Sequence, residues 1–574
     1  MNQRERRDLA EKWRRAWPAA LELWSRFTKL REPHWCFDAD EEQAEQLSGS
    51  FAMIRLTDQT IVISLAQVVE LGLEEYPLEV MGHEIGHHVF CPADLTDEAR
   101  LMARIRAGLP SLERYAGLVS NLYSDLLIND RLTRFSELRM GDIYRKMASA
   151  SASKLWTFYM RICEILWSLE RGTLARGELD RKTNSDAMLG ARVIRAYARE
   201  WLRGAGRFAV LCFDYIENEA KEMEALKRWL DTHGRAEGGL PDGLTEIDPD
   251  EIDGAIHPSL DEAISGVPVS EKERAGRTDI GDGVPRKRYR EPSNYADILR
   301  SVGVTLSDDE IVARYYRERA APHLVPFPVR EIPQSSEPLP ESLEPWDAGE
   351  ALDEIDVSGS VMVSPRVIPG YTTMKRVYGT MEGTLPRREP VDLYVGIDCS
   401  GSMANPRVIT SFPVLAGTII ALSALRAGSR VKVVLSGEPG QYVAMPDFSR
   451  NESEILKTLT SYLGTGYSFG IHRLAETFDA RNGTERPAQI LIVTDHDIFT
   501  MLGEKSSGRT GWEVARDALA KARGGGTYVL NMPAEWQPSG TKRMRDDGWV
   551  IASVTQWEEV VAFAREFSHR SYAT

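Results

Sequence analysis

The residues best suited to metal chemistry in the first part of the chain lie in the segment 81–88, which contains the pattern HExxH. His83 and His87 are four residues apart, so on a helix they point to the same side and both imidazoles can bind one metal ion. Glu84 lies one position further round, where its carboxylate can polarise a metal-bound water and accept its proton. The pattern predicts a hydrolytic zinc site with His83 and His87 as ligands and Glu84 as the catalytic base.

A catalytic zinc site needs a third protein ligand, and the segment 118–130 supplies a candidate. Asn121, Asp125 and Asn129 recur every four residues and form one polar stripe on an otherwise apolar helix. Burying a carboxylate flanked by amides is unfavourable unless it meets a cation. We therefore expect Asp125 to be the third zinc ligand, with Asn121 and Asn129 orienting the ligands.

Other interpretations of these residues stay open. The stripe also fits the wet face of an amphipathic helix, because serine and arginine side chains lie nearby. His88 adjoins the motif but points away from the other two histidines, which indicates a structural or rim role. The acidic residues that can replace Asp125 as a ligand are Asp130, Glu113 and Glu98.

The two predicted helices resemble those of the zincin metallopeptidases, in particular a bacterial metallopeptidase domain found fused to von Willebrand A-like domains. In that family, too, an HExxH helix is followed by a helix with the pattern N-x-x-x-D-x-x-x-N. The resemblance covers about residues 76–132. It implies zinc-dependent hydrolysis of a protein or peptide substrate.

A second set of polar side chains follows the apolar strands in the C-terminal part of the chain. One such strand ends in Asp398, and the turn after it carries Ser400 and Ser402. Thr465 lies in a Gly-Thr-Gly segment, and Asp495 ends a later apolar strand. All three motifs can converge on one edge of a sheet, where hard oxygen ligands suit Mg²⁺.

This part of the chain resembles a von Willebrand factor A domain with its metal-ion-dependent adhesion site. By that resemblance Ser400 and Ser402 bind Mg²⁺ through their hydroxyls, Thr465 binds it directly or through water, and Asp398 and Asp495 hold waters. An acidic side chain from a partner completes the coordination.

The sequence departs from that family at two places: Cys399 replaces a small or β-branched residue, and His496 with Asp497 replaces the usual glycine. A Rossmann-like domain with an incidental serine turn is the alternative. The stretch 346–373 resembles the lead-in of intracellular members that work beside MoxR-type AAA+ ATPases, which makes such an ATPase the expected partner. The chain has no Walker A sequence, so ATP chemistry belongs to another chain.

The pattern of apolar residues predicts a multidomain protein. Residues 1–230 read as a mainly α-helical, zincin-like domain, with one short strand at 61–65. Residues 231–390 form an acidic, Gly- and Pro-rich linker and lead-in, of which 231–282 reads as disordered. Residues 391–574 alternate apolar strands with helices, which indicates an α/β doubly wound, Rossmann-like von Willebrand A domain.

The composition of the chain limits the number of domains, the classes of partner and the cellular compartment that we expect. A chain of 574 residues is too long for one hydrophobic core, and its net charge of −16 disfavours nucleic-acid and anionic-membrane partners. Its five cysteines have no CxxC spacing, which fits a reducing compartment. The uncharged run 408–425 contains a proline, a glycine and hydroxyls and predicts a buried helix of the α/β domain. We expect a cytoplasmic protein.

Two functions follow from these patterns. The first is a zinc metallopeptidase coupled through its magnesium-dependent domain to a MoxR-type AAA+ ATPase. The second is a non-catalytic adaptor that recruits targets to the ATPase, as chelatase subunits with von Willebrand A domains do, and that holds a structural zinc. Glu84 separates them, because a purely structural site has no use for a general base.

Overall fold

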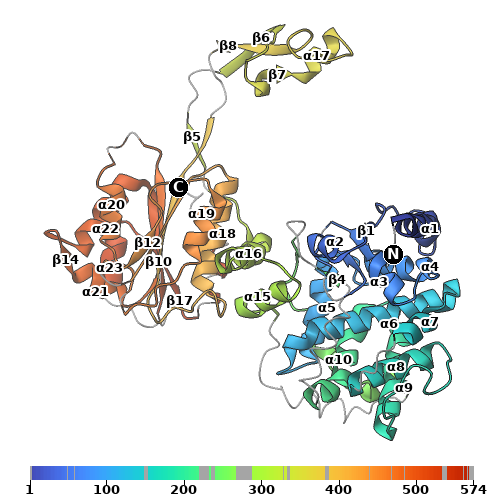
Figure 1. Cartoon of the computed structure of the whole chain (residues 1–574). Coiled ribbons are helices and arrows are strands. Elements are labelled where there is room, and N and C mark those ends of the chain that lie inside the picture. The colour runs from blue at the N-terminus through green and yellow to red at the C-terminus, as the bar shows by residue number, and fades with distance from the viewer. Residues whose placement is uncertain are drawn as a thin grey trace. The chain divides into compact units, whose positions relative to one another are not determined.

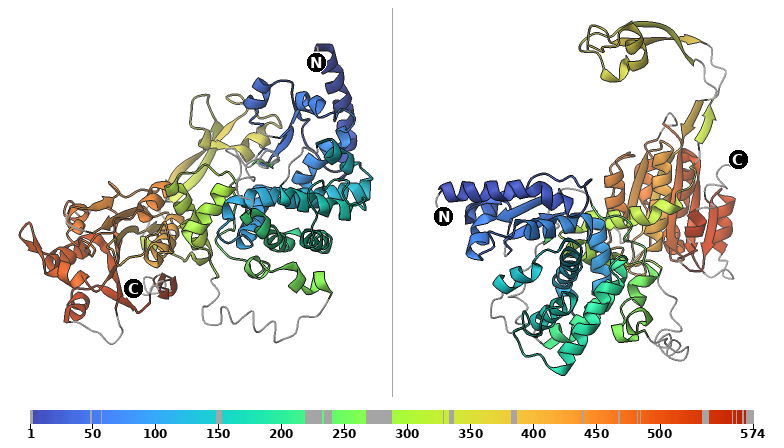
Figure 2. Two further views of the ribbon diagram at one scale, coloured as in Figure 1. Left: turned by 60° about the horizontal axis from the view of Figure 1, so that its bottom comes forward. Right: turned by 90° about the vertical axis from the view of Figure 1, so that its right-hand side faces the viewer.

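The structure is a computed structural model, and the chain forms two compact units (Figures 1 and 2). One unit is Met1–Glu318 with Arg407–Ile409, and the other is Arg319–Pro406 with Thr410–Thr574. The protein is therefore multidomain. The structure describes residues 3–47, 50–56, 58–147, 153–218, 232–233, 240–266, 288–327, 329–332, 337–381, 387–437, 440–466, 468–481, 483, 485–532, 539–556, 558–559, 561–564 and 567.

The first unit is mainly helical. Pro77 begins the helix that carries HExxH, at a position where the missing N–H has no helical partner to lose. The larger helices of this unit are α1 (Gln3–Glu22), α4 (Pro77–Val89), α5 (Leu95–Ala107), α6 (Ala116–Ser136), α7 (Met140–Met147), α8 (Lys154–Leu166), α9 (Arg181–Ala196), α10 (Trp201–Asn218) and α15 (Pro292–Ser301). Two shorter ones are α2 (Ala39–Ala44) and α3 (Leu65–Glu70), and α16 (Asp308–Ala320) ends at the unit boundary.

A small sheet accompanies these helices. Its strands are β1 (His34–Cys36), β2 (Ala52–Arg55), β3 (Thr60–Ser64) and β4 (Thr232–His233), in the order β1-β3-β2-β4. The sequence predicted only the strand that corresponds to β3. The other three strands have two to four residues, too short for an alternating pattern to emerge.

Helices α4 and α6 pack closely, and a glycine makes this approach feasible. A Cβ atom on Gly86 would lie 2.6 Å from Cγ2 of Ile128 on α6 and 2.6 Å from the Trp24 ring. Glycine at this position therefore lets the backbone of α4 approach α6. The close approach brings the polar residues of both helices together.

Residues 240–266 differ from the linker expected for this region. They contain α12 (Pro249–Asp253) and α13 (Glu262–Ser265), which contact α5, α9 and α10. Their acidic side chains pair with buried arginines: Arg290 donates two hydrogen bonds to Glu251 at 2.8 and 2.9 Å, and Arg207 pairs with Asp261. Because of these pairings, residues 240–266 form part of the helical unit although their acidic sequence is typical of a linker. Residues 231, 234–239 and 267–282 of the expected linker lie outside the described residues.

The second unit contains a six-stranded sheet in the order β12-β11-β10-β13-β16-β17. All neighbouring strands are parallel except β12, which is antiparallel to β11, so the sheet is mixed. Helices α18 and α19 lie against one face, and α20 to α23 against the other (Figure 1). The strands are β10 (Asp392–Asp398), β11 (Val431–Ser436), β12 (Tyr442–Ala444), β13 (Ala488–Asp495), β16 (Arg523–Asn531) and β17 (Val550–Val554).

Six helices accompany this sheet in the described residues, and the first begins later than the uncharged run 408–425 predicted. They are α18 (Phe412–Arg426), α19 (Glu452–Leu459), α20 (Arg473–Phe478), α21 (Ile498–Gly503), α22 (Gly511–Ala522) and α23 (Ser539–Asp546). Pro413 fits only in the first turn of α18, so the helix starts at Phe412 rather than at 408. The sequence also predicts a closing helix over 556–567, which lies partly outside the described residues.

A small module precedes β10 in the chain. Strands β5 (Val329–Ile332) and β9 (Arg387–Pro390) pair as an antiparallel ribbon. Between them in sequence lies a three-stranded sheet in the order β6-β8-β7, with helix α17 (yellow in Figure 1). Its elements are β6 (Glu337–Pro345), β7 (Ile355–Asp356), α17 (Val357–Val363) and β8 (Met374–Met381).

Another pair of short strands, β14 (Lys505–Ser506) and β15 (Arg509–Thr510), forms a hairpin before α22. Within the described part of the chain, no helix combines the length and apolar character that crossing a bilayer requires. The uncharged run that contains α18 is instead a helix packed on β10.

Candidate metal centres

The structure brings the two histidines of HExxH and Asp125 together. His83 and His87 Nε2 lie 3.3 Å apart, and Asp125 Oδ1 lies 3.7 Å from the first and 3.5 Å from the second. Helix α4 supplies both imidazoles and α6 supplies the carboxylate. The three atoms form a nearly equilateral triangle, an arrangement in which they can hold one metal ion.

Each imidazole is fixed by what its other nitrogen binds. Nδ1 of His87 lies 3.1 Å from the carbonyl oxygen of Cys91, which can only accept, so Nδ1 carries the proton and Nε2 has a lone pair. Nδ1 of His83 lies 2.8 Å from Oδ1 of Asn129, which sets the same tautomer. Both Nε2 lone pairs therefore face the carboxylate, and this electron-rich set favours a cation between its members.

Each of the two asparagines of α6 hydrogen-bonds one member of this cluster. Asn129 Nδ2 donates to the hydroxyl of Tyr144 at 3.0 Å, which turns its Oδ1 toward His83. Asn121 Nδ2 donates to Oδ2 of Asp125 at 3.1 Å and leaves Oδ1 of that carboxylate directed at the histidines. The polar stripe of α6 is buried and serves this cluster, which excludes the wet-face interpretation.

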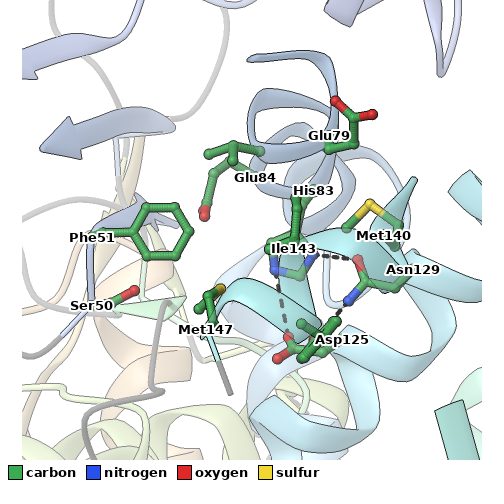
Figure 3. A pocket seen from close by; sticks show the side chains of 12 residues that line it. Ser50, Phe51, Glu79, His83, Glu84, Asp125, Asn129, Met140, Ile143 and Met147 are labelled. Atoms are coloured by element: carbon green, nitrogen blue, oxygen red, sulfur yellow. Dashed lines mark hydrogen bonds and ion pairs between the residues drawn. The ribbon is translucent and has the colours of Figure 1, made fainter. Parts of the chain in front are cut away.

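Glu84, His83 and Asp125 line one pocket of about 60 Å³, which is large enough to hold water (Figure 3). Glu84 is buried on α4, and the opposite walls come from Phe51 beside β2 and from Met147 at the end of α7. Figure 3 shows the Glu84 carboxylate on the Phe51 side of the His83 ring. The pocket combines the carboxylates of Glu79, Glu84 and Asp125 and the His83 imidazole with apolar walls.

The fallback ligands lie apart from this cluster. Asp130 pairs with Arg134 at 2.8 Å, and Glu98 accepts a hydrogen bond from Ser120 at 3.1 Å. Burial raises the pKa of Glu98 to about 7. Among the residues that the structure describes, the ligand cluster includes neither these two, nor Glu113, nor His88.

The donor set fits zinc. Four ligands placed tetrahedrally at about 2.0–2.1 Å from Zn²⁺ are about 3.3 Å from one another. The observed separations of 3.3 to 3.7 Å match that geometry within the range that small side-chain shifts cover. Two neutral imidazoles and one carboxylate are also a ligand set typical of catalytic zinc, with the fourth position left to water.

The second cluster lies at the carboxyl end of β10 and β13. Ser400 Oγ and Ser402 Oγ are 2.9 Å apart, and Ser402 donates to Oδ2 of Asp495 at 2.9 Å. Thr465 pairs with Ser400 as an isolated β-bridge, which brings the Gly-Thr-Gly segment beside the serine turn. The three motifs thus converge on one edge of the sheet.

Asp398 is buried beneath this turn. One oxygen accepts from the Ser400 N–H at 2.9 Å, and the other accepts from the hydroxyl of Thr494 at 2.8 Å. Burial raises the pKa of Asp398 to about 6, and the nearby charge of Asp495 adds to the rise. A bound cation would offset the energy of keeping this carboxylate ionised.

The oxygen set fits Mg²⁺. Adjacent ligands of an octahedral ion at about 2.1 Å are about 3 Å apart, which agrees with the 2.9 Å separations among Ser400, Ser402 and Asp495. Asp495, His496 and Asp497 also form a group of potential metal ligands, of which the last two are exposed. Cys399 points under the loop, where its Sγ accepts from the N–H of Leu463 at 3.0 Å.

Sequence reasoning missed the groups that support each site. Tyr144, the Cys91 carbonyl, Phe51 and Met147 have no local motif, and the turns or helices that carry them are brought to the zinc candidate only by folding. Thr494 differs, because it directly precedes Asp495 and its hydroxyl was visible in the strand sequence. Neighbouring side chains of a strand point to opposite faces of the sheet, so the strand pattern did not indicate that Thr494 would contact Asp398.

Comparison with known proteins finds a likeness among solved structures. No protein-family model matches the chain, and no curated protein matches it. Among solved structures, a "von Willebrand factor type A from Catenulispora acidiphila" is similar, with 19% sequence identity and a TM-score of 0.21. The match covers 32% of this chain and 43% of that protein, so it spans less than half of the relative. At this TM-score the likeness carries no functional argument.

Proposed function

We propose that the protein is a zinc-dependent metallopeptidase coupled through a magnesium-dependent von Willebrand A-like domain to a MoxR-type AAA+ ATPase. The observation that carries the peptidase part is the triangle of His83, His87 and Asp125, with Glu84 lining the same pocket as His83 and Asp125. Zincin-like helices and a protein or peptide substrate are part of this proposal.

Each residue around the zinc candidate has its own role in the proposed peptide hydrolysis. A bound zinc ion supplies Lewis acidity toward a carbonyl oxygen and lowers the pKa of a bound water. Glu84 accepts the proton of that water and returns it to the leaving nitrogen. Asn129 and the Cys91 carbonyl keep the imidazole tautomers in which both Nε2 atoms face Asp125. The apolar side chains of Phe51 and Met147 exclude water and accept an apolar group of the substrate.

The coupling part rests on the second cluster. The hydroxyls of Ser400 and Ser402 with Asp495 offer oxygens at the spacing that Mg²⁺ prefers, and a β-bridge places Thr465 beside Ser400. A carboxylate of the partner completes the coordination, so binding depends on both the metal and the geometry. With no Walker A sequence in this chain, ATP hydrolysis belongs to the partner.

One variant tests the peptidase proposal. Glu84→Gln keeps the size of the side chain but cannot accept a proton, so we expect unchanged zinc content and a loss of peptide hydrolysis of about 100- to 10,000-fold. The matched control is Glu79→Gln, because Glu79 lines the same pocket yet accepts from the Arg139 N–H instead. Hydrolysis of a peptide library by the zinc-loaded protein, with metal content measured in parallel, gives the answer.

A second function has one observation in its favour. The pocket is small and His87 is fully buried, which suits a structural zinc in an adaptor that recruits targets to the ATPase. In that case Glu84→Gln changes neither zinc content nor the support of ATPase-dependent activity. Equal target processing by Glu84→Gln and the parent protein would therefore favour the adaptor.

A further inference from the structure

Helix α17 exposes its large side chains and buries its small ones. Gly359 and Ser360 face the sheet, and a Cβ atom on Gly359 would lie 2.8 Å from Cδ2 of Leu343 on β6. Val361 and Met362 point outward, and the latter is 85% exposed. Soluble helices normally bury their apolar side, so this reversed arrangement marks a surface suited to a partner.

The apolar surface continues beyond the helix. Seven large apolar side chains lie along this part of the chain, and they range from 43 to 88% exposed. Together they present on the order of 600 Å² of apolar surface, the upper end for a patch on a monomer and close to one side of a standard interface. These residues are Val357, Val361, Met362, Val363, Val367, Ile368 and Tyr371.

The module does not use these side chains for its own core. In the described module, 337–381, Trp346 is the one large apolar side chain that is buried. A three-stranded sheet with a single buried aromatic side chain has little hydrophobic stabilisation of its own. Covering the outward residues by a partner would therefore stabilise the module as well as the complex.

The net charge of the module indicates what kind of partner surface can bind it. Residues 337–381 carry eight acidic and three basic side chains, a net charge of −5, whereas the segment 357–371 has Arg366 as its one charge. An apolar centre with an acidic surround complements an apolar groove bordered by Lys and Arg. The same charge disfavours a second copy of the module and an anionic lipid surface.

We infer that α17 and residues 364–371, here called the α17 face, dock into an apolar, basic-bordered groove of the partner ATPase. The inference rests on the proposed function for the identity of the partner. It adds a contact that needs no metal to the proposed magnesium-dependent one. The two contacts thus differ in their response to chelators and to salt.

The test uses the full chain and the purified MoxR-type ATPase of the same organism. Met362→Ser with Tyr371→Ser removes the two most exposed side chains of the α17 face, and we expect the Kd for the ATPase to rise roughly 10- to 100-fold. Folding should be unaffected because both side chains are exposed. Met188→Ser is the matched control, since Met188 is a half-exposed apolar side chain on α9 of the other unit.

Binding is measured by calorimetry with Mg²⁺ and with chelator, and Ser400→Ala is measured beside the double variant. If the double variant binds as the parent does, the inference is overturned, while loss of binding in chelator would still support the coupling proposal. If the double variant binds weakly and chelator has no effect, the inference stands and the magnesium coupling fails. Absence of binding by the parent protein overturns both.

Light scattering identifies the competing occupant. A parent protein that dimerises and a double variant that is monomeric would assign the α17 face to a second copy and overturn the inference. A charge-reversed pair, Asp353→Lys with Glu354→Lys, gives the supporting result if it weakens ATPase binding and flattens its dependence on salt. ATPase binding that strengthens in this pair contradicts a basic border on the partner groove.

Discussion

At the scale of single residues, the two histidines of the zinc candidate are held by neighbouring oxygen atoms that can only accept a hydrogen bond. A backbone carbonyl and an asparagine oxygen each accept a hydrogen bond from Nδ1 of one histidine, and the two Nε2 atoms face Asp125. Helical spacing made His83, His87 and Asp125 predictable, because i and i+4 side chains always share a face. The Tyr144 hydroxyl and the Cys91 carbonyl were not predictable, since tertiary packing brings them to the site.

Removal of one imidazole tests the ligand assignment. His83→Ala leaves two ligands, so we expect zinc affinity to fall at least 100-fold and bound zinc to approach zero after dialysis. His88→Ala, one residue beyond His87, should keep a full equivalent of zinc because it lies outside the cluster. Metal analysis of both variants after gel filtration is the measurement. Equal zinc content in His83→Ala and the parent protein would show the assignment to be wrong.

Substitution of Asp398 should abolish Mg²⁺ binding and at the same time stabilise the metal-free second unit. Its folded pKa is raised from 3.8 to about 6, so its stabilising contribution is complete below pH 3.8 and is lost as pH rises through about 6. That difference corresponds to about 3 kcal/mol. Asn can keep the contacts with the Ser400 N–H and Thr494, so Asp398→Asn should stabilise the metal-free second unit at pH 7.5 and lose Mg²⁺ binding.

Urea unfolding in chelator at two pH values checks this prediction. The stability gap between Asp398→Asn and the parent protein should shrink from pH 7.5 to pH 4.5, because the parent carboxyl is then largely protonated. Added Mg²⁺ should stabilise the parent protein and leave the variant unchanged. A variant that is less stable than the metal-free parent at pH 7.5 would show that burial of this charge is not unfavourable.

At the scale of elements, both clusters depend on close approaches between regular segments. The parallel strands β10 and β13 were predictable as continuous apolar runs, and the sheet order then brings Asp398 and Asp495 to one edge. The short helices α12 and α13 were not predictable, because they have only five and four residues, too few for an apolar pattern, and arginine pairs help to hold them. The module with α17 was not predicted, because its sequence is rich in proline and because α17 exposes its large apolar side chains and buries its small residues.

Gly86 tests whether the packing of α4 on α6 positions the ligands. Its Cβ would lie 2.6 Å from Ile128, so Gly86→Ala should force the helices apart, destabilise the first unit by about 1–3 kcal/mol and weaken zinc binding. Gly117→Ala is the matched control on α6, since no atom lies within 4 Å of its added Cβ. The control should keep its zinc and gain up to about 1 kcal/mol from helix propensity.

Thermal unfolding and zinc titration of the two glycine variants give the comparison. The contrast between them is informative because both substitutions add the same methyl group to a helix. If Gly86→Ala binds zinc with the parent affinity, the ligand geometry does not depend on this contact between α4 and α6.

At the scale of the whole molecule, the two proposed metal centres belong to different compact units. The zinc candidate is built from α4 and α6 of the first unit, whereas the magnesium candidate is built on the six-stranded sheet of the second. The second unit has its own hydrophobic core, formed by the sheet and the helices around α22. Metal binding to one unit should therefore stabilise that unit and leave the unfolding of the other unchanged.

Differential scanning calorimetry tests this independence. Zinc at about 1,000 times its Kd contributes about 4 kcal/mol, so removing it with 1,10-phenanthroline should lower the Tm of one of two transitions by roughly 10 °C. His83→Ala should reproduce that shift without the chelator, and Ser400→Ala should leave the zinc-dependent transition in place. Added Mg²⁺ should raise the other transition only. A single transition that responds to both metals would contradict independent units, because it requires the two metal centres to share one cooperative core.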